Sequence, residues 1–209
     1  MMDPCTEEGW IAAWRALGLV APTGLHAQLL TAWSEPQRHY HTLQHLGECL
    51  ALAEVLREQM ARPAEVIIAL WFHDAVYDVR AHDNEAQSAQ WAERALLGAG
   101  AAADVRKRII DLIMATCHGA LDAPPSSPDV ALLLDIDLAI LGAPEPRFAE
   151  YEAQICAEYS WVPLDVFAAK RPEVLRGFLA RERIYAMDTM HARFEAQARR
   201  NLSHAAGIS

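Results

Sequence analysis

The stretch that decides the fold reads VIIALWFHDAVYD, from Val66 to Asp78. Its first seven residues, Val66–Phe72, are all apolar, so we expect this segment in the protein interior. His73 and Asp74 follow directly, so they are drawn toward the same interior. Burial of these two charged groups costs free energy unless they have oppositely charged partners or hold a cation. The alternative is a helix end at which both side chains only satisfy backbone groups.

The rest of the chain has a helical pattern. Apolar residues recur at intervals of three and four positions, and Ala, Leu, Glu, Gln and Arg dominate the composition. Periodicity and propensity together predict an all-α fold. A proline-rich segment, residues 119–128, predicts the main loop. The expected helices cover residues 7–18, 22–34, 40–61, 63–77, 84–98, 102–117, 129–142, 145–159, 163–169, 172–185 and 188–202.

Length and charge limit the class of protein. A chain of 209 residues with 53% hydrophobic residues is long enough for one buried core, and we expect a single domain over residues 1–209. The net charge of −10 repels polyanions, so we expect no nucleic-acid polymer as a partner. A small phosphorylated ligand in a local pocket stays compatible with that charge.

We expect a cytoplasmic protein without a membrane partner. The longest apolar stretches, Val66–Phe72 and Ala131–Leu134, are far shorter than the roughly 20 residues of a membrane span. The acidic residues 1–9 lack the layout of an export signal. The four cysteines show no paired spacing, which favours reduced thiols and, for Cys49 and Cys156, small core residues.

Histidines are concentrated in one short segment. Three of the nine, His39, His41 and His45, fall between Arg38 and His45. His41 and His45 are four positions apart, so on a helix they share a face and lie within reach of one metal, or of a metal and its substrate. The alternative is a polar helix start whose histidines face solvent.

Two carboxylates, Asp135 and Asp137, interrupt the apolar segment Leu132–Leu141. Residues two positions apart on a helix diverge by about 200°, so only one of them can face a given site. A metal ligand explains one carboxylate better than a solvated face does. The other carboxylate then needs an arginine or a backbone partner.

These three segments together resemble the HD superfamily of metal-dependent phosphohydrolases. Tyr40-His41-x-x-x-His45 is similar to the opening motif of cyclic-nucleotide phosphodiesterases, which are distant HD relatives. A bacterial group described as predicted metal-dependent HD phosphohydrolases is similar over more of the chain: 38–45, 71–78, 83–85, 135–142, 181–185 and 198–202. The resemblance implies an HD-domain helical bundle with its core at about 38–142 and C-terminal helices, 145–202, packed on it.

The resemblance also implies a ligand set of His45, His73, Asp74 and Asp137 for a divalent cation. Asp137 is preferred to Asp135 because the last ligand of the family precedes a short apolar stretch that ends at a glycine, here Gly142. Nitrogen and oxygen donors suit Mn, Mg, Fe, Ni, Co or Zn and do not select among them.

The activity that the resemblance implies is hydrolysis of a small phosphate ester, with a nucleotide as one candidate, by a metal-activated water. The enzyme would be a phosphomonoesterase or a phosphodiesterase, and its partner a small phosphorylated substrate. Asp74 is the candidate to orient and deprotonate the water. His41 is the candidate acid that protonates the departing oxygen.

Three further residues, Glu85, His118 and Arg38, are candidates for a second metal or for the substrate. Each has an ordinary alternative: a helix start for Glu85, a helix C-terminal cation for His118, and pairing with a carboxylate for Arg38. Two other functions stay open, a di-iron HD-type oxygenase that needs Glu85 or His118 on a second iron, and a non-catalytic ligand-binding HD module. The sequence leaves the oligomeric state undecided.

Overall fold

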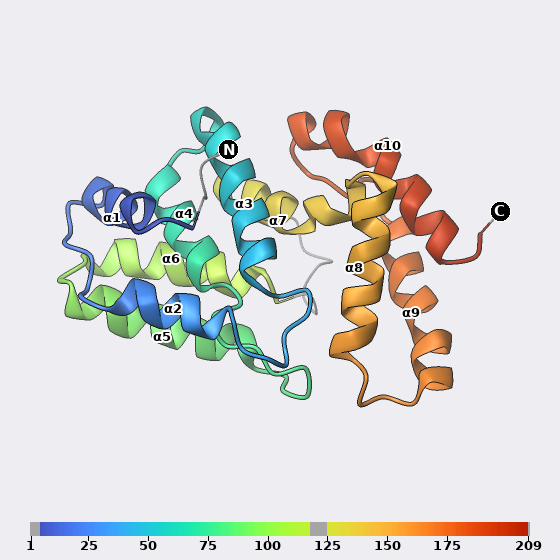
Figure 1. The fold of residues 1–209 in the computed structure, drawn as a ribbon. Coiled ribbons are helices and arrows are strands. Elements are labelled where there is room, and N and C mark those ends of the chain that lie inside the picture. Colours follow the sequence, from blue (N-terminus) through green and yellow to red (C-terminus); the bar gives the residue numbers. More distant parts are fainter. Residues whose placement is uncertain (1–4, 118–124, 209) are drawn as a thin grey trace. The chain divides into compact units, whose positions relative to one another are not determined.

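The computed structural model describes residues 5–117 and 125–208, and these residues form helices without a strand (Figure 1). The predicted all-α fold is therefore confirmed for this part of the chain. The predicted loop at 119–128 lies mostly outside the described residues, and the helix that follows it begins at Pro128. No helix within the described ranges is both long enough and apolar enough to traverse a bilayer.

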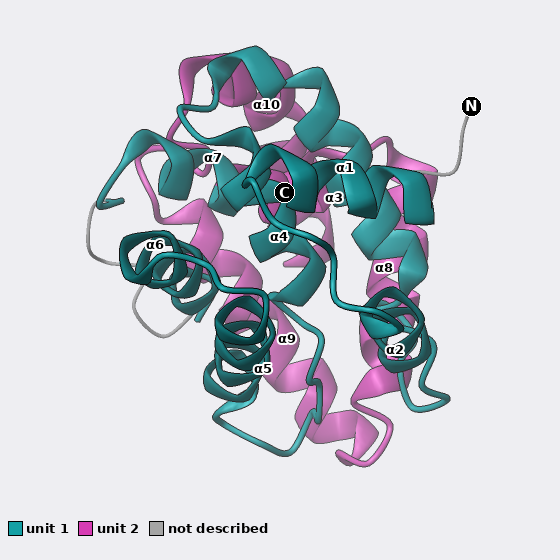
Figure 2. Ribbon diagram, turned by 90° about the vertical axis from the view of Figure 1, so that its left-hand side faces the viewer, with its two compact units in different colours: residues 1–134 teal, residues 135–209 magenta. Residues whose placement is uncertain are grey.

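The chain divides into two compact units, Met1–Leu134 and Asp135–Ser209 (Figure 2). The arrangement expected from the sequence, a single domain with its C-terminal helices packed on a core, stays a prediction.

The first unit is built around one buried helix, α4. Nearly all residues of α4 are buried, and α4 contacts α1, α3, α5 and α6. Pro63 begins α4 at a position where its missing N–H is harmless. The apolar run Val66–Phe72 therefore lies in the interior, as its composition predicts. The unit contains α1 (Glu7–Ala16), α2 (Leu25–Ala32), α3 (Leu43–Val55), η1 (Arg57–Gln59), α4 (Pro63–Phe72), α5 (Asn84–Gly98), α6 (Ala103–Ala115) and the first part of α7 (Pro128–Asp137).

Two helix ends near the histidines differ from the prediction. The helix expected from residue 40 begins at Leu43, because Thr42 has extended backbone angles and its Oγ1 accepts the N–H of Gln44 at 3.3 Å. His41 therefore lies in the turn before α3 and not on its surface. The helix expected to reach residue 77 ends at Phe72, which leaves the segment after it free to turn.

The second unit contains the end of α7, the 3-10 helix η3 (Leu138–Gly142), α8 (Glu145–Glu158), α9 (Leu164–Leu179) and α10 (Asp188–Ala205). The expectation of two helices, 163–169 and 172–185, was wrong. One continuous helix, α9, contains Pro172 in its interior, and residues 180–187 are not helical. The φ angle of proline is helical, so Pro172 removes one backbone hydrogen bond without ending the helix.

Tight packing joins η3 to α10. Asn201 of α10 donates from its side-chain amide to the carbonyls of Leu141 and Ala143, at 2.9 and 2.8 Å. A Cβ added at Gly142 would lie 2.7 Å from the carbonyl oxygen and from the Cβ of Phe194. Only a residue without a side chain allows this approach.

A Gly142→Ala substitution is therefore expected to destabilise the protein by about 1–3 kcal/mol through overpacking. The matched control is Gly177→Ala in α9, where a new Cβ meets no atom within 4 Å. It should stabilise the protein by about 0.5–1 kcal/mol, because alanine is the better helix former. Urea unfolding of both variants measures the difference, and equal effects would contradict the packing account.

Candidate functional site

Three predicted ligands meet in the first unit. His45 lies in the first turn of α3, His73 follows α4 as its C-cap, and Asp74 comes next. The Nε2 atoms of the two histidines are 3.2 Å apart, and Asp74 Oδ2 is 3.2 Å from His73 Nε2 and 3.9 Å from His45 Nε2. This group could hold a metal ion.

The environment of His73 fixes which ring nitrogen faces the cluster. Its Nδ1 lies 2.8 Å from the carbonyl oxygen of Leu70, one turn earlier in α4. A carbonyl only accepts, so Nδ1 carries the proton and donates it there. The lone pair of the neutral ring is then on Nε2, the atom that faces His45 and Asp74. Metal-binding histidines are commonly oriented by such a contact.

The spacing of the three donor atoms suits a small divalent cation. Ligand atoms about 2.1 Å from a metal, at right angles to each other, lie about 3.0 Å apart. The two 3.2 Å separations are near this value, and the 3.9 Å separation corresponds to a wider angle. Two imidazoles and a carboxylate are ligands that Zn, Fe, Co, Ni and Mn all accept.

His41 lies at the edge of this cluster. Its Nε2 is 4.0 Å from Asp74 Oδ2, and its ring stacks on Tyr77 with the centroids 4.1 Å apart. The side chains of His41 and Asp74 are 20% and 15% exposed, whereas those of His45 and His73 are 2% and 1% exposed. The cluster therefore has a buried side made by two imidazoles and an accessible side made by His41 and Asp74.

The two carboxylates of α7 have different surroundings. Asp135 accepts the backbone N–H of Ala186 at 2.9 Å and that of Met187 at 2.7 Å, just before α10. It is thus the carboxylate with the backbone partner that the sequence requires for one of the pair. Asp137 belongs to the second unit, whereas His45 is in the first, so its convergence with the histidines stays a prediction.

Of the three candidates for a second metal or for the substrate, Arg38, Glu85 and His118, two lie within the described residues. Arg38 is buried and donates to backbone carbonyls and to Glu35, so the pairing alternative describes it better than an open phosphate contact. Glu85 is half-buried in the first turn of α5, and its role in a second metal site stays a prediction. His118 lies outside the described residues.

Sequence reasoning missed one neighbour of the cluster. Cys49 is buried, and its Sγ lies 3.7 Å from Nδ1 of His45. Cys49 follows His45 by four residues on α3, and this spacing is the sequence signal that was missed. Its expected role as a small core residue agrees with its burial.

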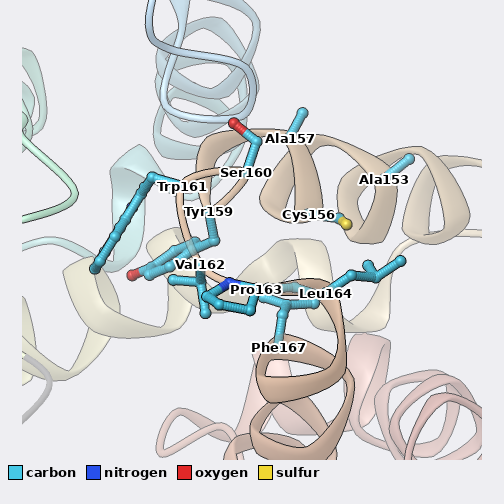
Figure 3. A pocket seen from close by; sticks show the side chains of 10 residues that line it. All are labelled: Ala153, Cys156, Ala157, Tyr159, Ser160, Trp161, Val162, Pro163, Leu164 and Phe167. Carbon is cyan, nitrogen blue, oxygen red and sulfur yellow. The ribbon is translucent and has the colours of Figure 1, made fainter.

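The second unit has a separate hollow of about 620 Å³ at the turn between α8 and α9 (Figure 3). Its rings include Tyr159, Trp161 and Phe167. The lining contains neither a histidine nor a carboxylate, in contrast to the His45 cluster.

Comparison of the chain with protein-family models, curated proteins and solved structures gives no match. The function of this chain is therefore inferred from the geometry of the His45 cluster and from the sequence motifs that carry it.

Replacing His45 or His73 with alanine is expected to weaken binding of cobalt(II) by more than about 100-fold, since loss of an outer-shell partner alone costs about 10–100-fold. His39→Ala is the control, because this exposed histidine belongs to the same segment but not to the cluster. Isothermal titration calorimetry on the folded variants measures the affinities. Equal losses in all three variants would contradict the assignment.

The pKa of Asp135 predicts that the stability of the protein depends on pH. Burial raises its pKa from 3.8 to about 6, against the opposing effect of the Met187 and Ala186 N–H groups. The folded state therefore favours the neutral acid, and this contribution to stability is full below pH 3.8 and is lost as the pH rises through about 6.

Relative to Asp135→Asn, the unmodified protein should gain up to about 3 kcal/mol of unfolding free energy as the pH falls from about 7 to about 4. Urea unfolding at several pH values measures this difference. A difference that stays constant over the range would show that Asp135 does not titrate in this way.

Proposed function

We propose that this protein is a metal-dependent hydrolase of small phosphate esters, of the HD type that its sequence resembles. The observation that carries the proposal is the convergence of His45, His73 and Asp74, which brings two buried imidazole nitrogens and a half-buried carboxylate oxygen to ligand spacing. An apolar interior holds such a group at a cost unless a cation binds there.

The proposed ligand set is His45, His73, Asp74 and Asp137. The engagement of Asp135 with two backbone N–H groups supports the choice of Asp137, because the oxygens of Asp135 already have donors. This set would hold a divalent cation, which would lower the pKa of water and offset the charge that develops on phosphorus.

The more exposed side of the cluster suggests separate catalytic roles for Asp74 and His41. Asp74 is a ligand with partial access to solvent, and it orients the attacking water and accepts its proton. His41 lies 4.0 Å from Asp74 Oδ2, with its ring centroid 5.8 Å from that of His45, and it donates a proton to the departing oxygen. The stacked ring of Tyr77 limits the orientations of His41.

The substrate class follows from charge and from this division of roles. A protein with a net charge of −10 disfavours polyanions, which leaves a small phosphomonoester or phosphodiester, including a nucleotide. An acid that protonates an alkoxide suits substrates whose leaving group is an alcohol.

The proposal predicts that His41→Asn lowers kcat for a responsive phosphoester by about 10²–10⁴-fold while cobalt(II) affinity is kept. His39→Asn is the matched control and should leave kcat unchanged. A panel of nucleotides and simple phosphoesters, assayed with each of the six divalent metals, identifies the substrate for this measurement.

Cobalt binding without hydrolysis of any phosphoester in the panel would contradict the proposed reaction. Substrate-dependent oxygen consumption by the iron-loaded protein would instead support the di-iron alternative. Full activity of His41→Asn would remove His41 from the mechanism.

A further inference from the structure

Arg38 is a buried cation beside the candidate metal centre, in the segment between α2 and α3. Its side chain is 0% exposed, whereas its carboxylate partner Glu35 is 42% exposed. Burial of a guanidinium is costly unless its N–H groups find acceptors. The acceptors of its N–H groups therefore indicate which parts of the chain Arg38 holds in place.

The N–H groups of Arg38 are shared between the two chain segments that form the site. Nη1 donates to the carbonyl of His41 at 3.2 Å and to that of Asp74 at 2.7 Å. Nη2 donates to the carbonyl of Ala75 at 3.0 Å, and Nε donates to Glu35 at 3.1 Å. One rigid group thus joins the turn that carries His41 to the turn that carries Asp74.

Two aromatic rings extend this connection. The Cζ of Arg38 lies 5.5 Å from the ring centroids of both Trp33 and Tyr77. The ring of Trp33 is 5.4 Å from that of His73, and Tyr77 stacks on His41. The contacts of the guanidinium therefore reach His41 and Asp74 through the backbone and reach His73 through a ring.

We propose that Arg38 is a positioning residue that sets the distance between the His41 turn and the His73-Asp74 turn, and so preorganises the cation site. This inference rests on the proposed function, because it assigns Arg38 to the same site. This role differs from a phosphate contact, since the Nε, Nη1 and Nη2 atoms of Arg38 all donate to acceptors within the protein.

The chemistry of the side chain explains why arginine is needed. Guanidinium is planar and presents five N–H groups in a fixed fork, so it holds several carbonyls at set angles. Lysine at this position would offer a single ammonium on a flexible stem. It would keep the charge but hold fewer of these carbonyls in place.

Calorimetric titration with cobalt(II) chloride tests this role in Arg38→Ala and Arg38→Lys. We expect the affinity to fall by about 10–100-fold in Arg38→Ala and by a smaller factor in Arg38→Lys, with both variants folded. Added guanidinium at a non-denaturing concentration should restore part of the affinity in Arg38→Ala, because it replaces the missing group.

The matched control is Arg199→Ala in the second unit. Arg199 donates to three carbonyls, those of Leu179, Arg181 and Glu182, and to one carboxylate, that of Glu195. Its loss removes a similar set of contacts, so it should lower the urea midpoint while leaving cobalt affinity unchanged.

The outcomes separate this inference from the proposed function. Absence of cobalt binding by the unmodified protein defeats the proposed function itself. Normal binding by the unmodified protein together with undiminished affinity in both Arg38 variants overturns only the role of Arg38. An equal loss of affinity in Arg199→Ala, or an unfolded Arg38→Lys protein, also overturns it, because Arg38 would then support the fold in general.

Discussion

The hydrogen bond from His73 to the carbonyl of Leu70 is the constraint on which the site depends. The apolar run of α4 brings His73 into the interior, where its side chain is 1% exposed. The 2.8 Å contact at Nδ1 leaves Nε2 as the lone-pair atom, 3.2 Å from His45 and from Asp74. A bound cation would stabilise these two buried imidazoles, because little solvent reaches them to compensate for their polarity.

The site also depends on two short non-helical segments being held together. Thr42 ends one segment by capping α3, and the other begins where α4 ends at Phe72. Hydrogen bonds from a single buried arginine, Arg38, cross between them. The buried imidazoles thus lie at the start of α3 and at the end of α4, and the two turns carry the more accessible side chains of His41 and Asp74.

Sequence reasoning succeeded where a residue's neighbours along the chain determine its surroundings. Helical periodicity gives the all-α fold, and the apolar run before His73 indicates its burial. Sequence reasoning was less accurate at Thr42 and Pro172. Thr42 caps α3, so the helix begins at Leu43, and Pro172 lies inside α9 without ending it. The pairing of Arg38 with a carboxylate was among the predictions, but its hydrogen bonds to Asp74 and Ala75 were not predictable, because these two backbone carbonyls are more than 30 residues away along the chain. The choice of Asp137 over Asp135 gained support only once the backbone partners of Asp135 were known.

Anomalous diffraction at the cobalt absorption edge, on crystals of the cobalt-loaded protein, locates the bound cation directly. We expect one ion about 2.0–2.2 Å from His45 Nε2, from His73 Nε2 and from an oxygen of Asp74, with Asp137 as the fourth protein ligand. Cobalt bound elsewhere, or a His45 cluster that stays without cobalt at saturating concentration, would show that these residues do not form a metal site.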